Sequence, residues 1–362
     1  MPTKSVFIAA CFAAVASAAV AVAQQNQTAT ASAEASSNSG TTGATAWVPP
    51  GTPGSEIDGT LFHAQVLMSA HGFSPGVIDG KKGESFRLAL RSFQESRGLE
   101  VNGELDQPTR RALLDANRPS TVMVKLGPDD VRGQYVLPFP SDPERQAELE
   151  FLGYRNMLEK LAERYHTTPA TIVALNGPDK KIGLGHTLRL PNVVAQTGDY
   201  SSADGDGAHV MRVLNVDSNQ PSGDYVVVDK SEGVLKVYVG DVGAKTGKLV
   251  AAFPVTMGSK EYPLPLGTWK ATTYDYLPPF KYQPAILNNP KTNKELDLPP
   301  GPNGPVGVAW LDLTKEHYGI HGTNEPQTIG RAESSGCIRM TNWDVLRLSQ
   351  IMKPGFTAIF QA

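Results

Sequence analysis

The chain has 362 residues, of which 40% are hydrophobic and 19% charged, and its formal net charge is −3 at pH 7. This composition is typical of globular protein, and the length is sufficient for two or three domains. The nearly balanced charge excludes the strongly basic surface on which nucleic-acid binding depends, so no nucleic-acid partner is expected.

The first residues have the pattern of a secretory signal peptide, which we place at 1–23. Lys4 precedes an apolar run over 6–22, and the run ends in a small-residue Ala-Val-Ala pattern. A membrane anchor is the alternative, but the run is rich in alanine, barely of spanning length and followed by a polar tract. We therefore expect an exported protein with no stable membrane span after signal cleavage.

Signal cleavage would also remove Cys11, and Cys337 would then be the only cysteine of the mature chain. An intramolecular disulfide or a multi-cysteine metal site could then not form. An unpaired thiol is a liability in an oxidising compartment, which suggests that the thiol itself is used. The alternative is a small buried core residue, the commoner fate of an isolated cysteine.

Two segments of contrasting composition follow the signal peptide. Residues 24–56 are mainly Ser, Thr, Ala, Asn and Gly, a composition that buries too little apolar surface to fold, so a disordered tether is expected. Residues 59–116 show apolar residues at helical spacing in two stretches, and Asp106 followed by Pro108 opens a third helix. We expect a small three-helix module there.

A recurring set of turn and core residues runs through 59–116. It comprises Val77-Ile78-Asp79-Gly80, Leu90-Arg91-Ser92-Phe93-Gln94, Gly98-Leu99, Asn102-Gly103 and Thr109. This set resembles the peptidoglycan-binding domain type 1 family, and the resemblance implies that the module binds peptidoglycan. The same residues would form turns and core in any case.

Residues 150–193 predict a second small unit. Leu161 and Tyr165 share a helix face, Thr168-Pro169 caps a following helix, and Leu190-Pro191 ends a strand. The unit resembles a LysM glycan-binding repeat, which implies a small α+β domain and contact with glycan strands. A structural linker domain without carbohydrate binding is the alternative.

The last part of the chain is rich in predicted strands. Residues 195–222 contain much Ser, Gly and Asp and are expected to be a linker. Over 224–361 only Trp343–Met352 has the pattern of a good helix, with Asn342 as its cap. A mainly β domain of sandwich or barrel-like form is predicted. Its strands are expected at Tyr225–Val228, Val234–Val239, Leu249–Val255, Thr268–Thr272, Val306–Leu311 and Thr357–Phe360.

Cys337 and His321 lie 337 − 321 = 16 positions apart and are the candidate nucleophile and general base. A thiol becomes a strong nucleophile only as thiolate, which requires an imidazole or a local positive field. Gly336 would allow backbone N–H groups to approach a developing oxyanion. Arg339 would share a face with Cys337 in an extended strand and could supply positive charge or bind a substrate carboxylate.

Taken singly, each of these residues has an ordinary structural interpretation, but their order is distinctive. The sequence reads Tyr318-Gly-Ile-His-Gly-Thr323 and then Ser334-Ser-Gly-Cys-Ile-Arg-Met340. This block is similar to the L,D-transpeptidase catalytic domain, also called the YkuD domain, and further matches extend the similarity to about 224–361. The further matches are Pro254, Gly258, Pro265-Leu266-Gly267, Gly301-Pro302-Asn303 and Val306-Gly307.

The resemblance implies a role for each matching position. His321 corresponds to the base and Cys337 to the nucleophile. Ser335 stands where many members have a second histidine, so a backbone carbonyl or the Ser335 hydroxyl is left to orient His321. Leu264 replaces a usual threonine. Oxyanion or substrate-positioning roles are implied for Ser334, Ser335, Gly336, Arg339, Tyr318 and Gly322.

The resemblance also implies the reaction. The Cys337 thiolate attacks the amide between the third residue of a tetrapeptide stem and its terminal D-Ala, and D-Ala leaves. The amine of a second stem then resolves the thioester and forms a 3→3 crosslink. An outer-membrane lipoprotein or water are alternative acceptors. No metal or cofactor is implied, carbapenems are expected to acylate Cys337, and the periplasm of a Gram-negative bacterium, at the cell wall, is the expected location.

Two other interpretations compete. His317, His321 and Cys337 could be metal ligands, but residues four apart in an extended chain lie too far apart to share an ion. Alternatively, the last domain could be a degenerate scaffold in a cell-wall binding protein that has no catalytic activity. Such a scaffold would need neither His321 nor Cys337.

Overall fold

The fold is known from a computed structural model that describes residues 47–362, apart from 202, 204, 243–246, 260, 288–289, 332–333 and 335. The predicted signal peptide, 1–23, and residues 24–46 of the predicted tether lie outside the described residues. The end of that predicted tether, residues 47–56, is described, and its Trp47 indole donates a hydrogen bond to the Ala174 carbonyl at 2.9 Å.

A helical module comes first and confirms the three predicted helices. These are α2 (Gly59–Ala70), α3 (Glu84–Arg97) and α4 (Gln107–Leu113), followed by the short 3₁₀ helix η1 (Leu114–Ala116). Asp106 begins α4 as predicted, since its carboxylate accepts the Thr109 N–H at 2.9 Å. Phe73, Phe86 and Phe93 fill the core of the module.

The second unit contains two helices and a two-stranded antiparallel sheet. Helices α7 (Met157–Arg164) and α8 (Pro169–Asn176) lie within the predicted range 150–193, as does strand β2 (Thr187–Pro191). Its partner β1 (Thr121–Lys125) lies outside that range. The prediction missed β1 because its pairing partner is distant in sequence. Helices α5 (Pro128–Val131) and α6 (Pro143–Gln146) lie between β1 and α7.

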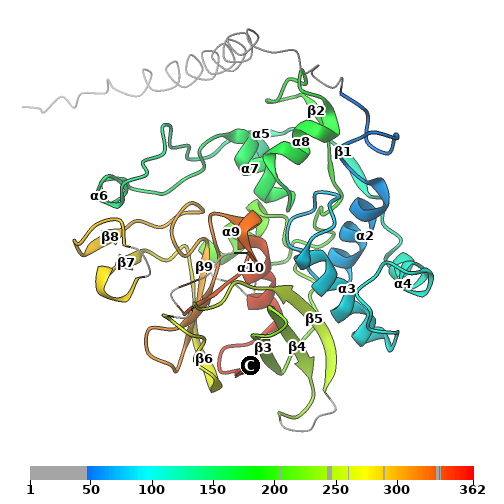
Figure 1. Ribbon diagram of the computed structural model, residues 1–362. Helices are drawn as coiled ribbons and strands as arrows, with labels where there is room; N and C mark the ends of the chain where they lie inside the picture. The colour runs from blue at the N-terminus through cyan, green and yellow to red at the C-terminus, as the bar shows by residue number, and fades with distance from the viewer. Residues whose placement is uncertain are drawn as a thin grey trace, which may run out of the picture. The chain divides into compact units, whose positions relative to one another are not determined.

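The last domain is built on an eight-stranded sheet in the order β11-β10-β9-β6-β12-β3-β4-β5 (Figure 1). The pairs β10/β11 and β12/β3 are parallel and the others antiparallel. The strands are β3 (Tyr225–Asp229), β4 (Val234–Val239), β5 (Lys248–Pro254), β6 (Gly267–Tyr276), β9 (Ala309–Leu313), β10 (Gly319–His321), β11 (Ile338–Arg339) and β12 (Thr357–Gln361).

The two outermost strands of this order meet at one point. Thr256, just beyond β5, exchanges backbone hydrogen bonds of 3.0 and 2.9 Å with Arg339 of β11. The sheet therefore curls back on itself, which confirms the predicted mainly β, barrel-like domain. A small hairpin of β7 (Phe280–Tyr282) and β8 (Leu296–Leu298) is attached, together with the 3₁₀ turns η2 (Pro284–Ile286) and η3 (Pro326–Thr328).

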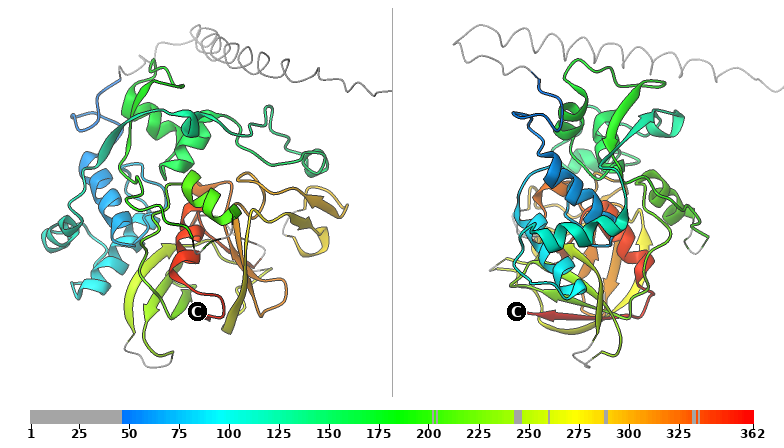
Figure 2. Two further views of the ribbon diagram at one scale, coloured as in Figure 1. Left: turned by 180° about the vertical axis from the view of Figure 1, so that it is seen from behind. Right: turned by 90° about the vertical axis from the view of Figure 1, so that its right-hand side faces the viewer.

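Helix α10 (Asn342–Ile351) follows β11 directly and packs against the sheet (Figures 1 and 2). Its N-cap is Thr341, not Asn342 as predicted, because the Thr341 hydroxyl accepts the Asp344 N–H. The Asn342 side chain is turned into the protein, where it is fully buried. Trp343 is 1% exposed and anchors the helix in the core.

The predicted linker 195–222 is part of the core of the last domain rather than a free connection. It contains helix α9 (Gly205–Val213), and Val210, Met211 and Leu214 are buried in the same apolar cluster as the sheet. The Ser, Gly and Asp residues that favoured a linker lie around these apolar positions. The core therefore begins upstream of residue 224.

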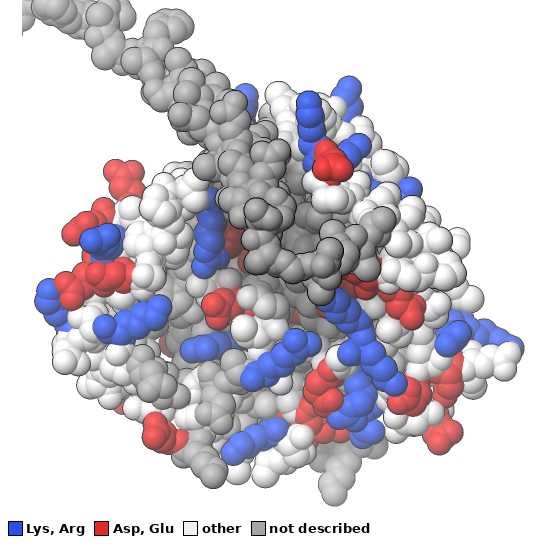
Figure 3. Space-filling model, turned by 45° about the horizontal axis from the view of Figure 1, so that its top comes forward, with Lys and Arg blue, Asp and Glu red and all other residues white. Residues whose placement is uncertain are grey.

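The surface carries no large region of one charge on the face shown in Figure 3, where Lys and Arg side chains are interspersed with Asp and Glu. Among the helices of the described residues, none combines the length and the apolar character needed to cross a bilayer.

Burial of His166 predicts a loss of stability in acid. The ring is 4% exposed and stacks on Trp343 at 5.0 Å, its Nε2 contacts the Leu214 carbonyl at 2.7 Å, and burial lowers its pKa to about 3. The folded protein binds this proton more weakly than the unfolded chain, in which the histidine pKa is about 6.5. The stability that the neutral ring contributes is therefore present above about pH 6.5 and is lost as the pH falls below it. Between pH 7 and pH 5 we expect wild type to lose about 2 kcal/mol more than His166→Asn. Denaturant unfolding at both pH values tests this, and equal losses would contradict it.

Candidate active site

The candidate nucleophile and base are brought together by the parallel pairing of β10 and β11. Ile320 pairs with Ile338 and His321 with Arg339. Cys337 immediately precedes β11, beside the start of β10, and its sulfur lies 3.6 Å from the His317 carbonyl oxygen. Two segments separated in sequence thus form one site at the edge of the sheet.

A short turn holds Cys337 in place. The buried Ser334 hydroxyl donates to the Cys337 carbonyl at 2.7 Å and accepts the Gly336 N–H at 3.2 Å. Gly336 has φ +105°, and a Cβ there would lie 2.6 Å from the Tyr318 ring. Ser334 therefore shapes the turn that precedes Cys337, and its hydroxyl accepts the Gly336 N–H. Ser335 lies outside the described residues.

Cys337 is a free cysteine in the described part of the chain. Burial raises its pKa, and this effect exceeds the lowering by a backbone hydrogen bond from Gly319 and by the charge of Arg339. A neutral thiol at pH 7 requires a base to remove its proton during the reaction.

His321 is positioned as a neutral imidazole. It is 4% exposed and stacks on Trp310, with ring centroids 5.3 Å apart. Its Nδ1 lies 2.7 Å from the Gly322 carbonyl oxygen. Because a carbonyl can only accept, Nδ1 carries the proton and Nε2 keeps a free lone pair. Burial, and to a smaller extent Arg339, lowers the pKa of His321 to about 3.

The sequence left either a backbone carbonyl or the Ser335 hydroxyl to orient His321, and the structure places the Gly322 carbonyl next to its ring. Arg339 lies beside His321 in the register of β10 and β11, and its charge interacts with Cys337 and Glu325. Burial lowers the pKa of Arg339, but a guanidinium remains charged at neutral pH. The site therefore combines a neutral thiol, a neutral imidazole and one fixed positive charge.

Asn342 is a residue of this site that the sequence analysis assigned only to a helix cap. Its Oδ1 accepts the Val308 N–H at 3.1 Å. A Cβ at Gly307 would lie 2.0 Å from this oxygen, and one at Gly322 would lie 2.1 Å from it. The Asn342 amide therefore packs between the backbones of Gly307 and Gly322. The Gly322 carbonyl is the one that contacts His321. Asn342 belongs to no predicted motif, and its role depends on a contact between distant segments.

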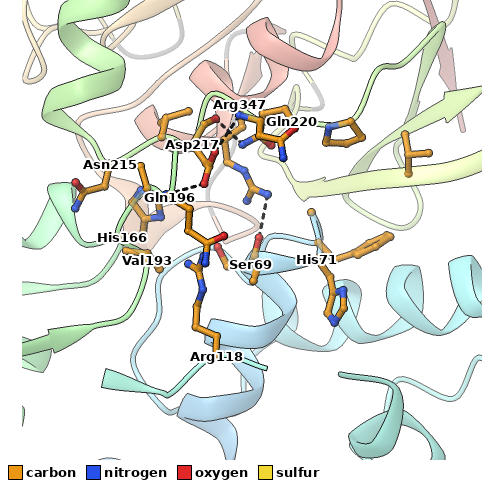
Figure 4. Close-up of a pocket in the computed structure, with 18 of the residues that line it drawn as sticks. Ser69, His71, Arg118, His166, Val193, Gln196, Asn215, Asp217, Gln220 and Arg347 are labelled. Atoms are coloured by element: carbon orange, nitrogen blue, oxygen red, sulfur yellow. Dashed lines mark hydrogen bonds between the residues drawn. The ribbon is translucent and has the colours of Figure 1, made fainter. Parts of the chain in front are cut away.

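Two cavities among the described residues have no contact with Cys337. One, of about 460 Å³, lies among Ser69, Arg118, His166, Asp217 and Arg347 (Figure 4). Another, of about 680 Å³, is lined mainly by α7, α9 and the segment after α5. Within the described residues, no three His, Cys, Asp or Glu side chains are arranged to hold a metal ion.

Comparison with known families matches two parts of the chain. Residues 223–360 match the family described as L,D-transpeptidase catalytic domain, and residues 62–113 match a "Putative peptidoglycan binding domain". Neither of these two matches covers the unit predicted to resemble LysM, and its glycan binding stays a prediction.

Curated relatives are similar over part of the chain. "Putative L,D-transpeptidase YkuD" of Bacillus licheniformis is 61% identical over 56 residues, which is 16% of this chain and 34% of that protein. "Putative L,D-transpeptidase YqjB" of Bacillus subtilis is 28% identical over 140 residues, 37% of this chain and 69% of that protein. The chain thus spans about a third of the length of the first relative.

Solved structures also show similarity. An L,D-transpeptidase from Mycobacterium smegmatis is 20% identical with a TM-score of 0.30, over 38% of this chain and 58% of that chain. An L,D-transpeptidase from Xylanimonas cellulosilytica is 14% identical with a TM-score of 0.35, over 88% of this chain and 98% of that chain.

The contact between Gly336 and Tyr318 predicts a specific sensitivity to Gly336→Ala. A positive φ costs a non-glycine residue about 1–2 kcal/mol, and overlap with a packed ring adds about 1–3 kcal/mol. Gly355→Ala is the matched control, because Gly355 also has a positive φ but no atom within 4 Å of the added Cβ. Denaturant unfolding should show the larger loss for Gly336→Ala, and equal losses would argue against the overlap.

The neutral thiol predicts a particular pH dependence. Burial raises the pKa of Cys337, so alkylation by iodoacetamide should speed up about tenfold per pH unit and reach no plateau below about pH 8.5. The chain without residues 1–23 is suited to the measurement, with Cys337→Ala as the blank. A plateau already present at pH 6 would indicate a thiolate–imidazolium pair instead.

Proposed function

We propose that this chain, which carries an L,D-transpeptidase catalytic domain at residues 223–360, uses Cys337 to cleave a peptidoglycan tetrapeptide stem and form a 3→3 crosslink. The observation that supports the proposal most directly is the pairing of β10 with β11. It brings a half-buried thiol next to a strand that ends in a histidine with a free Nε2.

In the first half of the reaction, Nε2 of His321 takes the proton of the Cys337 thiol as the sulfur attacks the carbonyl carbon before D-Ala. A tetrahedral intermediate forms with negative charge on oxygen, and Arg339 opposes this charge electrostatically. The C–N bond then breaks. His321 returns its proton to the departing amine, D-Ala leaves with a neutral amino group, and a thioester remains on Cys337.

In the second half, the side-chain amine of another stem attacks the thioester. His321 accepts a proton from this amine and returns it to the sulfur as the C–S bond breaks. The products are a new amide crosslink and the free thiol, so the enzyme is regenerated without a cofactor. Water or the lysine amine of an outer-membrane lipoprotein would react by the same steps, giving a shortened stem or a protein anchored to the wall.

The remaining predicted site residues have supporting roles in this proposal. Ser334 and Gly336 hold the nucleophile turn, and Gly322 orients the base. The Tyr318 ring, packed against Gly336, positions the stem. Ser335 is proposed to contact substrate near the thiol.

The module at 62–113 supports a polymeric substrate. A domain that holds peptidoglycan raises the local concentration of stems at the tethered active site. We further propose that the protein acts outside the cytoplasmic membrane, in the periplasm, where it contributes to cell wall organisation and cell shape.

The mechanism predicts a covalent adduct on one residue. Intact-protein mass spectrometry of the mature chain incubated with a carbapenem should show a single adduct, and incubation with a tetrapeptide stem should release D-Ala. Cys337→Ala should do neither, and His321→Ala should react about 10²–10⁴-fold more slowly because the thiol loses its base.

Folded wild type that gives no adduct and no D-Ala, yet still binds cell-wall sacculi, would establish the scaffold function instead. With D-Ala release established, adding an acceptor stem, a lipoprotein peptide or water alone identifies the acceptor from the mass of the product.

A further inference from the structure

Helix α10 forms hydrogen bonds with the two units that precede the last domain, the helical module that contains α2–α4 and the unit that contains α7 and α8. These join Asn342 Nδ2 to Glu163 Oε1 at 2.6 Å, Ser74 Oγ to Asp344 Oδ2 at 2.6 Å, and Arg347 Nη2 to the Ser69 carbonyl at 3.0 Å, the last visible in Figure 4. Among these α10 residues, Asn342 also reaches the candidate active site.

Glu163 is a buried carboxyl on α7, in the unit that precedes the catalytic domain. It is 6% exposed. Tyr154 donates its hydroxyl proton to Oε2 at 2.8 Å, and Asn342 donates to Oε1. Burial raises the pKa of Glu163 to about 8, although the hydrogen bonds from Tyr154 and Asn342 oppose this rise. Burying such a group is unfavourable unless its oxygens accept hydrogen bonds, and both do so here.

The contact with Glu163 fixes which way the Asn342 amide faces. Its NH₂ group points to Glu163 and to the Pro302 carbonyl, while its oxygen accepts the Val308 N–H. A rotation of the amide by 180° would place an NH₂ group against that N–H. The bond to Glu163 therefore keeps the amide oxygen wedged against Gly322.

Gly322 transmits this constraint to the base. Its carbonyl oxygen accepts the Nδ1 proton of His321 at 2.7 Å, which keeps Nε2 free. If Asn342 shifts, Gly322 loses the atom that packs against its Cα, and its carbonyl can turn away from His321. The imidazole would then lose both its orientation and its tautomer.

We propose that Glu163 is a positioning residue for the reaction at Cys337, acting through Asn342 and Gly322 on the imidazole of His321. The inference rests on the proposed function of Cys337 and His321. It assigns α7 a part in the catalytic architecture whether or not its unit binds glycan.

The test compares three variants of the mature full-length chain. Glu163→Met keeps the side-chain volume but removes the acceptor for Asn342. Glu163→Gln keeps an oxygen that can accept from Asn342 and should rescue activity. Lys160→Met is the matched control, because Lys160 lies on the same helix, is 4% exposed and donates to the carbonyls of Asp129 and Arg132, away from Asn342.

The measurement is the rate of carbapenem acylation at several carbapenem concentrations, followed by mass spectrometry. Misplacing a catalytic group by about 1 Å slows a reaction on the order of 100-fold. We therefore expect Glu163→Met to lower the saturating rate by about 10- to 100-fold, with an unchanged half-saturating concentration. Glu163→Gln and Lys160→Met should stay within about threefold of wild type.

The outcomes separate the two proposals. A wild-type chain without adduct overturns the proposed function and this inference together. A reactive wild type with an equally reactive, folded Glu163→Met overturns this inference alone, as does an equal loss in Lys160→Met. If Glu163→Met does not fold, Glu163→Asp takes its place, because its shorter side chain withdraws the acceptor from Asn342. An unchanged acylation rate in that variant also overturns the inference.

Discussion

The parallel pairing of β10 with β11 is the constraint on which the site depends. Strand β11 contains two residues, and few backbone hydrogen bonds hold it to β10. Its other edge is held by Thr256, where the sheet closes on itself. Closure satisfies backbone groups that an edge strand would expose. Cys337 directly precedes this strand, which is held on both edges, so the closure of the sheet determines where the candidate nucleophile lies.

Burial then sets the chemical state of the two reactive groups. Removing a thiol and an imidazole from water disfavours the charged form of each, which raises the pKa of Cys337 and lowers that of His321. The resting pair is therefore neutral. A neutral thiol is less reactive toward oxidants than a thiolate. In the mechanism proposed above, removal of the thiol proton would accompany the attack by sulfur.

The site is also shaped by parts of the chain that precede the catalytic domain. Glu163 and Ser74 come from two different N-terminal units and contact α10 within three residues of each other. Buried polar groups of this kind contribute little net stability but are unfavourable when a partner is missing. They therefore favour one arrangement of the units around α10. Glycines at 307 and 322 leave room for the Asn342 amide, and no other residue would fit there.

Local signals in the sequence determined most of the helices and strands of this protein and singled out its candidate catalytic residues. Asp106 and Pro108 predicted where a helix begins, alternating β-rich runs predicted a mainly β domain, and the order of His321 and Cys337 indicated thiol chemistry. Each of these depends on neighbours within a few residues. Only the tertiary structure showed that β1 forms, that α9 is buried in the core and that the Asn342 side chain lies beside the candidate active site. These depend on contacts between segments far apart in the chain, where burial and hydrogen-bond pairing outweigh local preference.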